Sequence, residues 1–266
     1  MAIYDENFSK SMDLIRKYSE DANIFGDGYF VGFSGGKDSQ VMLDLFRRSG
    51  VKYHAHYSVT SNDMPENVYF IRKEYPDVEF IHPKLNFFQL IEKRKMLPTA
   101  YRRYCCAYLK EQHGKGFIAL GCRREESAKR SKYTTLIFEK NMEPYDRDKM
   151  SKDKRVRFYP ILEWTELEIW QYIEDNGIPV NPCYESSGRV GCMFCPFAPK
   201  RNLIYNAKRY PRYHKLLMRS IQRLITNGYM GDFAQVTAEQ VWEWWISKEN
   251  AKSFFTQLDL FDDEKY

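Results

Sequence analysis

The sequence predicts an open, mostly parallel twisted sheet with helices on both faces, an α/β fold. Short apolar runs alternate with amphipathic segments along most of the chain, which is the pattern of successive βαβ units. Two glycines join the first apolar run to an amphipathic segment, as in a strand that turns directly into a helix. With 266 residues, the chain is long enough for one such domain and an extension.

The individual elements follow from hydrophobic periodicity. The first helix is expected over residues 8–22, and Thr165 with Glu168 forms a capping box for another. Strands are expected at 29–33, 53–59, 79–82 and 117–120, and further helices at 41–46, 66–75, 87–95, 164–173, 203–207, 213–226 and 238–247. Residues 141–154 are charged and weakly periodic, which indicates a mobile loop. The expected domains are an α/β domain with the cysteines (1–199), a basic helical extension (200–256) and a tail (257–266).

The strongest functional signal is the hexapeptide Ser34-Gly35-Gly36-Lys37-Asp38-Ser39. A strand that turns through glycines into a helix presents backbone N–H groups and a positive dipole end, both of which attract phosphate or sulfate. Lys37 adds a positive charge, and Ser34 and Ser39 add hydroxyl donors. This is not a Walker A loop, because Val31 and Asp38 stand where that motif needs Gly and Ser or Thr.

Three segments are expected to meet near this turn. Ligands of open parallel sheets bind beyond the carboxyl ends of the strands. The segments that follow three of the expected strands are residues 34–39, 60–66 and 121–130. They are therefore predicted to lie along one edge of the sheet and to surround one anionic ligand.

The six cysteines indicate a metal centre. Cys105 and Cys106 are adjacent, and Cys192 and Cys195 form a C-x-x-C pair. Four thiolates suit an iron–sulfur cluster or a structural zinc, and adjacent cysteines fit the separate corners of a cubane better than one tetrahedral ion. Cys183 is an alternative fourth ligand. A zinc site and free thiols remain open as alternative interpretations of the cysteines. Cys122 is interpreted as a buried thiol beside the expected cleft.

These motifs together resemble the phosphoadenosine/adenosine phosphosulfate reductase family of the PP-loop superfamily, over about residues 25–200. The matching segments, in the family's order, are Ser34–Ser39, Cys105–Cys106 with Leu109-Lys110, Gly121–Ser127 with Arg130, Pro160–Thr165, Asn181-Pro182 and Gly191–Cys195. The resemblance implies that Cys105, Cys106, Cys192 and Cys195 hold a 4Fe–4S cluster beside the nucleotide, with Cys183 as an alternate ligand.

The resemblance also implies roles around the nucleotide. The expected nucleotide- and phosphate-binding residues are Ser34, Gly35, Gly36, Lys37, Asp38, Ser39, Thr60, Asp63, Glu66, Arg124 and Arg130. Lys37, Asp38, Arg124 and Arg130 are the expected catalytic residues. For the two arginines, which present forked donors to anionic oxygens, surface salt bridges are the alternative reading.

The chain departs from sulfonucleotide reductases in one respect. Those enzymes attack the bound sulfate with a cysteine of a C-terminal segment, but no cysteine follows Cys195 here. Unless Cys122 or Cys183 replaces it, reduction lacks its nucleophile. The remaining features resemble the ATP-using relatives that install sulfur, namely the DNA phosphorothioation protein and cluster-bearing tRNA thiolases. In that chemistry ATP is split between its α and β phosphates, the acceptor is adenylated, and a sulfur donor displaces AMP.

The same resemblance implies Mg²⁺ at the leaving pyrophosphate, with Asp38 and Asp63 as carboxylates. A separate sulfur-donor protein is a further expected partner. Two other functions remain open: a reductase that forms sulfite from adenylylsulfate or its 3′-phosphate, and a non-catalytic nucleotide-sensing adaptor.

Charge and the last residues suggest the partners. The net charge is +5, and residues 200–223 hold eight basic and no acidic residues, which suits either nucleic acid or a solvated helix face. The tail peptide matches the pattern that bacterial sliding clamps bind, although it also suits packing on its own domain; its residues are Gln257, Leu258, Asp259, Leu260 and Phe261. No apolar stretch reaches membrane length and the start lacks a signal-peptide pattern, so a cytoplasmic protein is expected. The basic segment and the tail peptide together indicate DNA as its partner.

Overall fold

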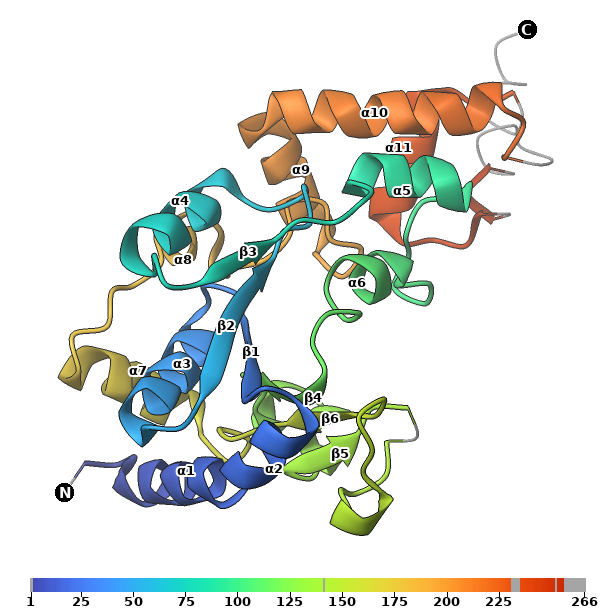
Figure 1. The fold of residues 1–266 in the computed structure, drawn as a ribbon. Coiled ribbons are helices and arrows are strands. Elements are labelled where there is room, and N and C mark those ends of the chain that lie inside the picture. Colours follow the sequence, from blue (N-terminus) through green and yellow to red (C-terminus); the bar gives the residue numbers. More distant parts are fainter. Residues whose placement is uncertain (1, 141, 231–234, 252, 256–266) are drawn as a thin grey trace, which may run out of the picture. The chain divides into compact units, whose positions relative to one another are not determined.

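The structure, a computed structural model, describes residues 2–140, 142–230, 235–251 and 253–255 (Figure 1). It divides into two compact units. The first comprises residues 1–59, 64–82 and 112–190, and the second comprises residues 60–63, 83–111 and 191–266. No helix in the described part of the chain combines the length and apolarity needed to cross a bilayer.

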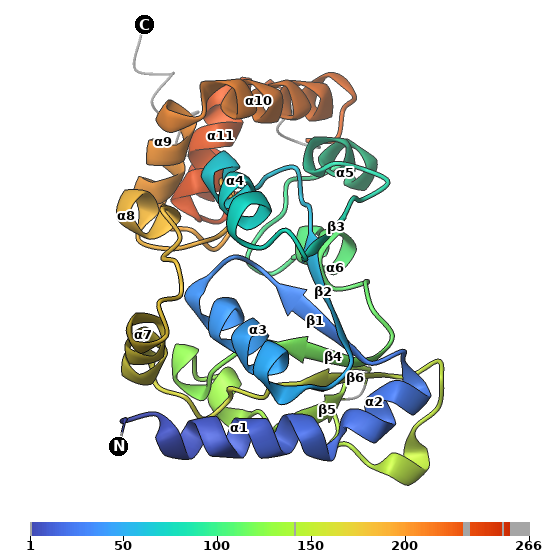
Figure 2. The same cartoon turned by 60° about the vertical axis from the view of Figure 1, so that its left-hand side comes forward.

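The first unit is built on a six-stranded sheet in the order β3-β2-β1-β4-β6-β5. The strands are β1 (Tyr29–Phe33), β2 (Tyr53–Ser58), β3 (Glu79–Ile81), β4 (Gly116–Leu120), β5 (Leu136–Phe138) and β6 (Arg155–Phe158). All neighbours pair in parallel except β5, which is antiparallel to β6. The predicted mostly parallel α/β fold is confirmed, and Figure 2 shows helices lying beside this sheet.

The helices of the first unit are α1 (Asp5–Lys17), α2 (Ser19–Phe25), α3 (Lys37–Ser49), α4 (Pro65–Glu74), α7 (Glu166–Asp175) and α8 (Cys183–Ser187), with three short 3₁₀ turns, η1 (Arg124–Glu126), η2 (Arg130–Lys132) and η3 (Arg147–Lys149). The single helix expected over residues 8–22 is wrong. Two helices meet at Tyr18, whose ring packs against Phe117 and Phe158 of the sheet and so fixes the break. The capping box of Thr165 and Glu168 is confirmed.

Strands β5 and β6 were not expected from the sequence, because β6 alternates arginines with apolar residues over only four positions. Val156 and Phe158 enter the core, while Arg155 and Arg157 both pair with Glu139. The charged connection between the two strands was expected as a loop. Within it Tyr145 packs against the core and donates a hydrogen bond to Asp21 Oδ2 at 2.7 Å.

The core of the first unit anchors α3, the helix that begins at the glycine turn. Val41, Met42, Leu45 and Phe46 are completely buried, as the periodicity indicated. The ring of Tyr29 on β1 meets Phe46 edge-on at 5.1 Å. A strand and a helix packed this tightly hold the turn between them in one position.

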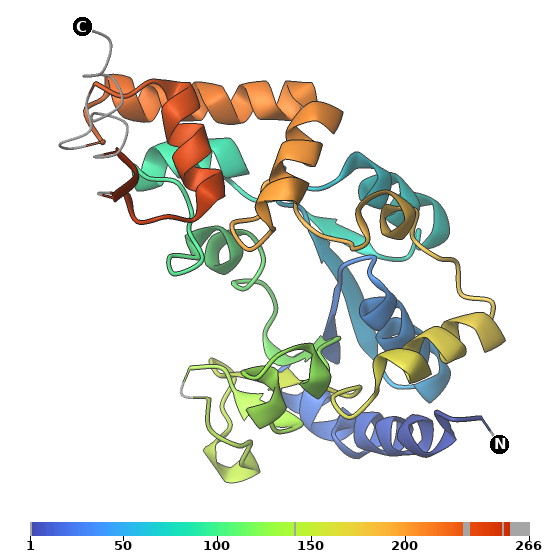
Figure 3. The ribbon, with the colours of Figure 1, turned by 180° about the vertical axis from the view of Figure 1, so that it is seen from behind.

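The second unit is helical. It contains α5 (Phe87–Arg94), α6 (Tyr104–Leu109), α9 (Lys200–Arg209), α10 (Pro211–Thr226) and α11 (Ala238–Ser247). Seen from behind, α10 runs across α9 and α11 (Figure 3). Trp245 Nε1 donates to Pro98 O at 2.7 Å, and Arg223 pairs with Glu92 at 2.7 Å. These contacts join residues 83–111 to the C-terminal helices, so the compact units divide the chain differently from the boundaries expected at 199 and 256.

The residues of the expected clamp-binding peptide, Gln257, Leu258, Leu260 and Phe261, lie outside the described residues.

Candidate functional site

The glycine turn leads from β1 directly into α3. Gly36 is the N-cap of α3 and has no side chain to cap the helix, and Gly35 adopts a φ of +76°. Within the described residues, the backbone N–H groups of Asp38 and Ser39 have no protein acceptor. Free N–H groups at the positive end of a 13-residue helix favour a bound anion.

The two serines of the turn brace it from inside. Ser39 Oγ donates to Gly36 O at 2.8 Å, accepts the N–H of Ser34 at 3.2 Å and lies 3.0 Å from Ser34 Oγ. Ser34 Oγ also accepts the N–H of Gly36 at 3.3 Å. Both hydroxyls therefore hold the shape of the turn, and their expected contact with an anion stays a prediction.

Two asparagines that the sequence analysis did not single out as site residues support the turn from behind. Asn67 Nδ2 donates to Ser34 O at 3.1 Å, and Asn181 Nδ2 donates to Gly35 O at 2.9 Å. Asn181 also donates to Asn67 Oδ1 at 2.7 Å. Both side chains are buried, so two carbonyls of the turn are held by buried amides.

A tyrosine missed by the sequence analysis lies at the start of α3. The N–H of Lys37 donates to the hydroxyl of Tyr184 at 2.8 Å. The ring of Tyr184 meets Trp170 edge-on at 5.3 Å, and Lys37 Nζ lies 6.0 Å from the centre of each ring. Burial raises the pKa of Tyr184 to about 12, so the hydroxyl is neutral and keeps its proton for a ligand at neutral pH.

The charged side chains of the turn form an ion-pair network. Lys37 Nζ lies 3.3 Å from Asp38 Oδ2 and 3.5 Å from Glu166 Oε1. Asp38 Oδ1 accepts from Nε of Arg123, an arginine that is only 2% exposed and that also pairs with Glu125. Arg123 is thus the arginine that contacts the turn, although the sequence analysis named its neighbour. Its position directly before Arg124 in the same motif was the only available signal.

Arg124 and Arg130 have protein partners in the first unit. Arg124 Nε donates to both carboxylate oxygens of Glu163 at 2.8 and 2.9 Å, and its Nη1 donates to the carbonyl of Ser131 at 2.8 Å. Arg130 pairs with Glu126. These contacts match the salt-bridge reading, and an anion-binding role for either arginine stays a prediction.

The expected convergence of three segments is found for two of them. Gly121 packs so closely on the start of α3 that a Cβ atom there would lie 3.0 Å from Asp38 C and Ser39 N, and Arg123 follows it. Glu66 lies in the first turn of α4, in the same unit. Thr60 and Asp63 belong to the second unit, so their expected contact with the nucleoside stays a prediction.

In the second unit, residues 60–63 shape the C-x-x-C turn. Asn62 O accepts the N–H of Met193 at 2.8 Å, and Asn62 Oδ1 accepts the N–H of Phe194 at 3.0 Å. Asp63 is held by Thr60, whose N–H and hydroxyl each donate to it at 2.7 Å. The turn that carries Cys192 and Cys195 is therefore fixed by a segment far away in the sequence.

All four expected ligand cysteines lie in the second unit and influence one another. A hydrogen bond from Cys105, helped by Arg103 and Lys110, lowers the pKa of Cys106 to about 6. Burial raises the pKa of Cys192, and the charge of Lys110 opposes that rise. All six cysteines are free thiols, and Cys183 lies buried in the first unit.

The cysteine set suits a metal in its chemistry but not in its present geometry. Four thiols with cationic side chains nearby are what an anionic cluster needs. Among the described residues, however, no three Cys, His, Asp or Glu side chains are arranged so as to hold a metal ion. The cluster therefore stays a proposal.

Cys122 is unsuited to act as the missing nucleophile. It follows β4, and burial raises the pKa of its thiol to about 11. Since the thiolate is the reactive form, this raised pKa disfavours Cys122 as the nucleophile at neutral pH.

The open, mostly parallel sheet and the glycine turn at the end of β1 define an α/β protein whose helix α3 begins at a turn that suits an anionic ligand. Residues 28–198 match the family model of the phosphoadenosine phosphosulfate reductase domain. The match covers more than half of the chain, and the chain belongs to this family.

The relatives that are similar in sequence align with only part of this chain. An uncharacterized protein of Methanocaldococcus jannaschii is 27% identical over 214 residues, which are 76% of this chain and 49% of that protein. Sulfate adenylyltransferase subunit 2 of Pseudomonas putida is 32% identical over 91 residues, 30% of each chain. The chain thus matches half or less of the length of these relatives.

Solved structures with a similar fold include two fungal proteins. Phosphoadenylyl-sulfate reductase of Candida auris, in a phosphate complex, has a TM-score of 0.48 at 14% identity over 72% of this chain and 97% of that chain. FMN adenylyltransferase of Candida glabrata has a TM-score of 0.49 at 13% identity over 72% of this chain and 65% of that chain.

Proposed function

We propose that the Ser34–Ser39 turn binds the phosphates of ATP and that the protein cleaves ATP to AMP and pyrophosphate in order to activate an acceptor for sulfur transfer. The observation that carries this proposal is the start of α3, where free N–H groups of Asp38 and Ser39 lie beside Lys37. Donors fixed before the ligand arrives stabilise developing negative charge without reorganisation. Pyrophosphate, which gains charge as it leaves, is the natural occupant.

The reaction has two steps. An acceptor oxygen attacks the α-phosphorus, a new O–P bond forms and the bond to the β-phosphate oxygen breaks, so that pyrophosphate leaves. A sulfur nucleophile, supplied by a donor protein, then replaces the adenylated oxygen and releases AMP. Lys37 neutralises the leaving group, and Arg123 holds Asp38 beside it. The relatives named as a sulfate adenylyltransferase subunit favour adenylyl transfer over reduction. Arg124 and Arg130 remain proposed contacts for anionic oxygens.

Magnesium is expected to arrive with the nucleotide. Both oxygens of Asp38 face protein cations, and both oxygens of Asp63 accept from Thr60, so neither carboxylate is free to form a magnesium site by itself. Mg²⁺ is commonly held by substrate phosphates and few protein ligands. When bound, it neutralises charge on the leaving pyrophosphate.

We propose further that Cys105, Cys106, Cys192 and Cys195 hold a 4Fe–4S cluster, with Cys183 as the alternate ligand. A cluster would supply electron transfer or an iron site for sulfur. Binding requires the four thiols to close around the metal from their present positions. The Asn62 contacts that fix residues 192–195 would then position two of the four ligands.

Iron content tests the cluster. Protein purified without oxygen is expected to contain about four iron and four sulfide ions per chain. Its absorption spectrum should show the visible band of such a cluster. Cys192→Ser should lose most of the iron, whereas Cys122→Ser, a change at a partly buried thiol of the other unit, should retain it. A colourless protein that contains zinc would contradict the assignment.

Pyrophosphate release tests the activity. Lys37→Met is expected to lower ATP-dependent pyrophosphate release at least a hundredfold, because removing one preorganised donor to developing negative charge costs about 2.7–4 kcal/mol. Lys73→Met, at an exposed lysine of α4, is the matched control and should behave as the unchanged protein. Release of sulfite from adenylylsulfate with thioredoxin would favour the reductase instead. Nucleotide binding without any turnover would favour the sensing adaptor.

The acceptor is proposed to be nucleic acid, with DNA thio-modification as the reaction. The eight basic residues of the segment 200–223, all exposed, support this choice. Recruitment by a sliding clamp through the tail and a cytoplasmic location remain proposals from the sequence alone.

A further inference from the structure

We propose that one exposed row of cations on α10 binds the phosphate backbone of double-stranded DNA without reading its sequence. The row consists of Arg212, Lys215 and Arg219, hereafter the α10 row. The proposal deepens the proposed function, since it rests on nucleic acid as the acceptor and names the surface and the form of nucleic acid that this surface fits.

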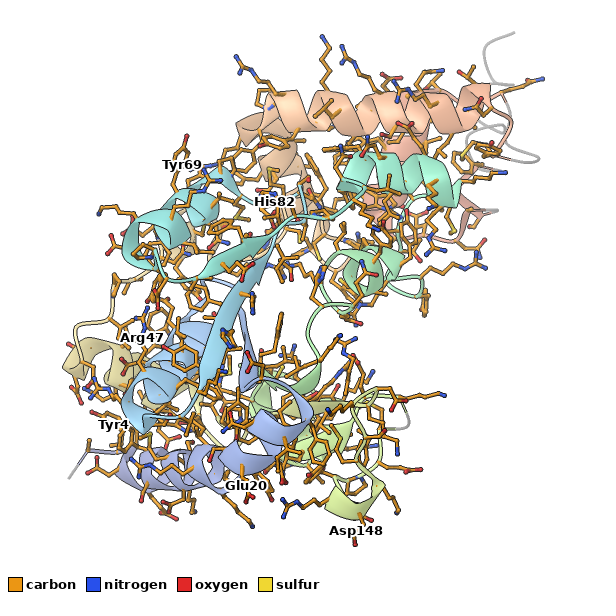
Figure 4. The ribbon with its side chains drawn as sticks, in the orientation of Figure 1. Tyr4, Glu20, Arg47, Tyr69, His82 and Asp148 are labelled. Atoms are coloured by element: carbon orange, nitrogen blue, oxygen red, sulfur yellow. The ribbon has the colours of Figure 1, made fainter. Side chains whose placement is uncertain are left out.

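The α10 row lies on the outer side of an amphipathic helix. Its members are spaced by three and four residues, so they share one face of an α-helix. The buried residues Leu217, Ile221 and Leu224 are on the opposite side, packed toward the rest of the second unit. Figure 4 shows nitrogen-tipped side chains projecting from the outer side of α10.

In the described part of the chain, no ion pair neutralises the charges of the row. Within the described residues, no carboxylate oxygen lies within 4.0 Å of a side-chain nitrogen of Arg212, Lys215 or Arg219. Their neighbour Arg223, by contrast, pairs with Glu92 at 2.7 Å. On α9, exposed Arg201 and Lys208 likewise have no carboxylate partner in the described part of the chain. Such a concentration of like charge is held in place by the fold and gains from an anionic partner.

The dimensions of the row suit a duplex. Arg219 follows Arg212 by seven positions, which at 1.5 Å per residue is about 10 Å along a straight helix. One strand of duplex DNA presents a phosphate about every 3.4 Å along its axis, or about three phosphates over this length. Three cations therefore face about three phosphates.

Other polyanions fit the row less well. A membrane-surface helix needs an exposed apolar side, but the apolar side of α10 is buried in the second unit. Single-stranded nucleic acid is bound chiefly by aromatic side chains that stack on its bases. Of the tyrosines near the row, Tyr210 is buried and Tyr213 is partly buried. The exposed ring of Tyr205 on α9 is covered by the guanidinium of Arg209. A rigid row of cations alone matches the regular backbone of a duplex.

The salt dependence of DNA binding tests the proposal. The full chain is titrated with a mixed-sequence DNA duplex of about 20 base pairs at several salt concentrations between about 50 and 200 mM. Each phosphate contact contributes about −0.9 to the slope of log K against log salt. The triple variant Arg212→Gln, Lys215→Gln, Arg219→Gln should therefore have a slope shallower by about 2.7 and an affinity at least tenfold lower at about 100 mM salt.

A second triple variant controls for net charge. Arg16→Gln, Lys17→Gln, Lys152→Gln removes three exposed cations from the first unit and should leave the slope unchanged. An equal slope for the α10 variant and the unchanged protein would overturn the proposal, and so would equal affinity for a single strand of the same sequence. ATP binding, measured on the same samples, distinguishes a failure of this DNA-binding proposal from a failure of the proposed function. If the unchanged protein bound DNA through the row but did not bind ATP, only the proposed function would be refuted.

Discussion

Gly35→Ala is expected to abolish phosphate binding at the turn and to lower the free energy of unfolding by about 3 kcal/mol. Gly35 has a φ of +76°, and a Cβ atom there would lie 2.3 Å from Asn67 Oδ1 and 3.0 Å from Ile71 Cγ1. Asn67 cannot simply turn away, because its amide holds Ser34 O and accepts from Asn181. The substitution must displace the turn or break this buried network. Denaturant unfolding and calorimetric titration with pyrophosphate measure the two effects.

Gly50→Ala is the matched control for this prediction. Gly50 has nearly the same φ, +73°, at the other end of α3, and nothing lies within 4 Å of its added Cβ. Gly50→Ala should therefore lower the free energy of unfolding by about 1–2 kcal/mol through backbone strain alone. Its affinity for pyrophosphate should be unchanged. If the two variants lost equal stability and both bound pyrophosphate normally, the Asn67 contact would not constrain the turn.

Arg123→Met is expected to destabilise the protein by about 3–5 kcal/mol, because it leaves the carboxylate of Asp38 poorly solvated and without its main partner. Arg123 is 2% exposed, and the Asp38 side chain is 16% exposed. ATP affinity should fall at least tenfold as Asp38 and Lys37 lose their positions. Unfolding in denaturant gives the first quantity and calorimetry the second.

Two further variants show whether Arg123 acts through Asp38. The double variant Arg123→Met, Asp38→Asn should be more stable than Arg123→Met alone, since it removes the carboxylate oxygen that lost its Arg123 partner. Arg47→Met breaks the exposed pair with Asp77 and should cost about 1 kcal/mol or less without affecting ATP. A double variant no more stable than the single variant would show that the Arg123–Asp38 pair does not determine stability.

The local parts of the site could be predicted from the sequence. The turn after β1, the presence of a helix after it and the capping box of Thr165 each depend on residues within a few positions of one another. The helix itself is longer than the expected 41–46, because it begins at Lys37. Glycine tolerance of positive φ and the geometry of a helix start are properties of the backbone, so they can be recognised without a fold.

The supports of the site could not be predicted in the same way. Asn67 and Asn181 lie 33 and 146 residues from the carbonyls that they hold, and Tyr184 lies 147 residues from Lys37. The choice between Arg123 and Arg124 depends on which side of η1 faces α3. Likewise, the packing of α5 against α10 decides that residues 83–111 belong with the C-terminal helices.

The sequence by itself therefore determined the prediction of a phosphate-binding turn, because the N–H groups, the glycines and Lys37 are consecutive in the chain. Only the tertiary structure decided which side chains secure that turn, because hydrogen-bond partners are selected by proximity in space. The sheet order β3-β2-β1-β4-β6-β5 places β1 and β4 side by side, and with them the turn and Arg123.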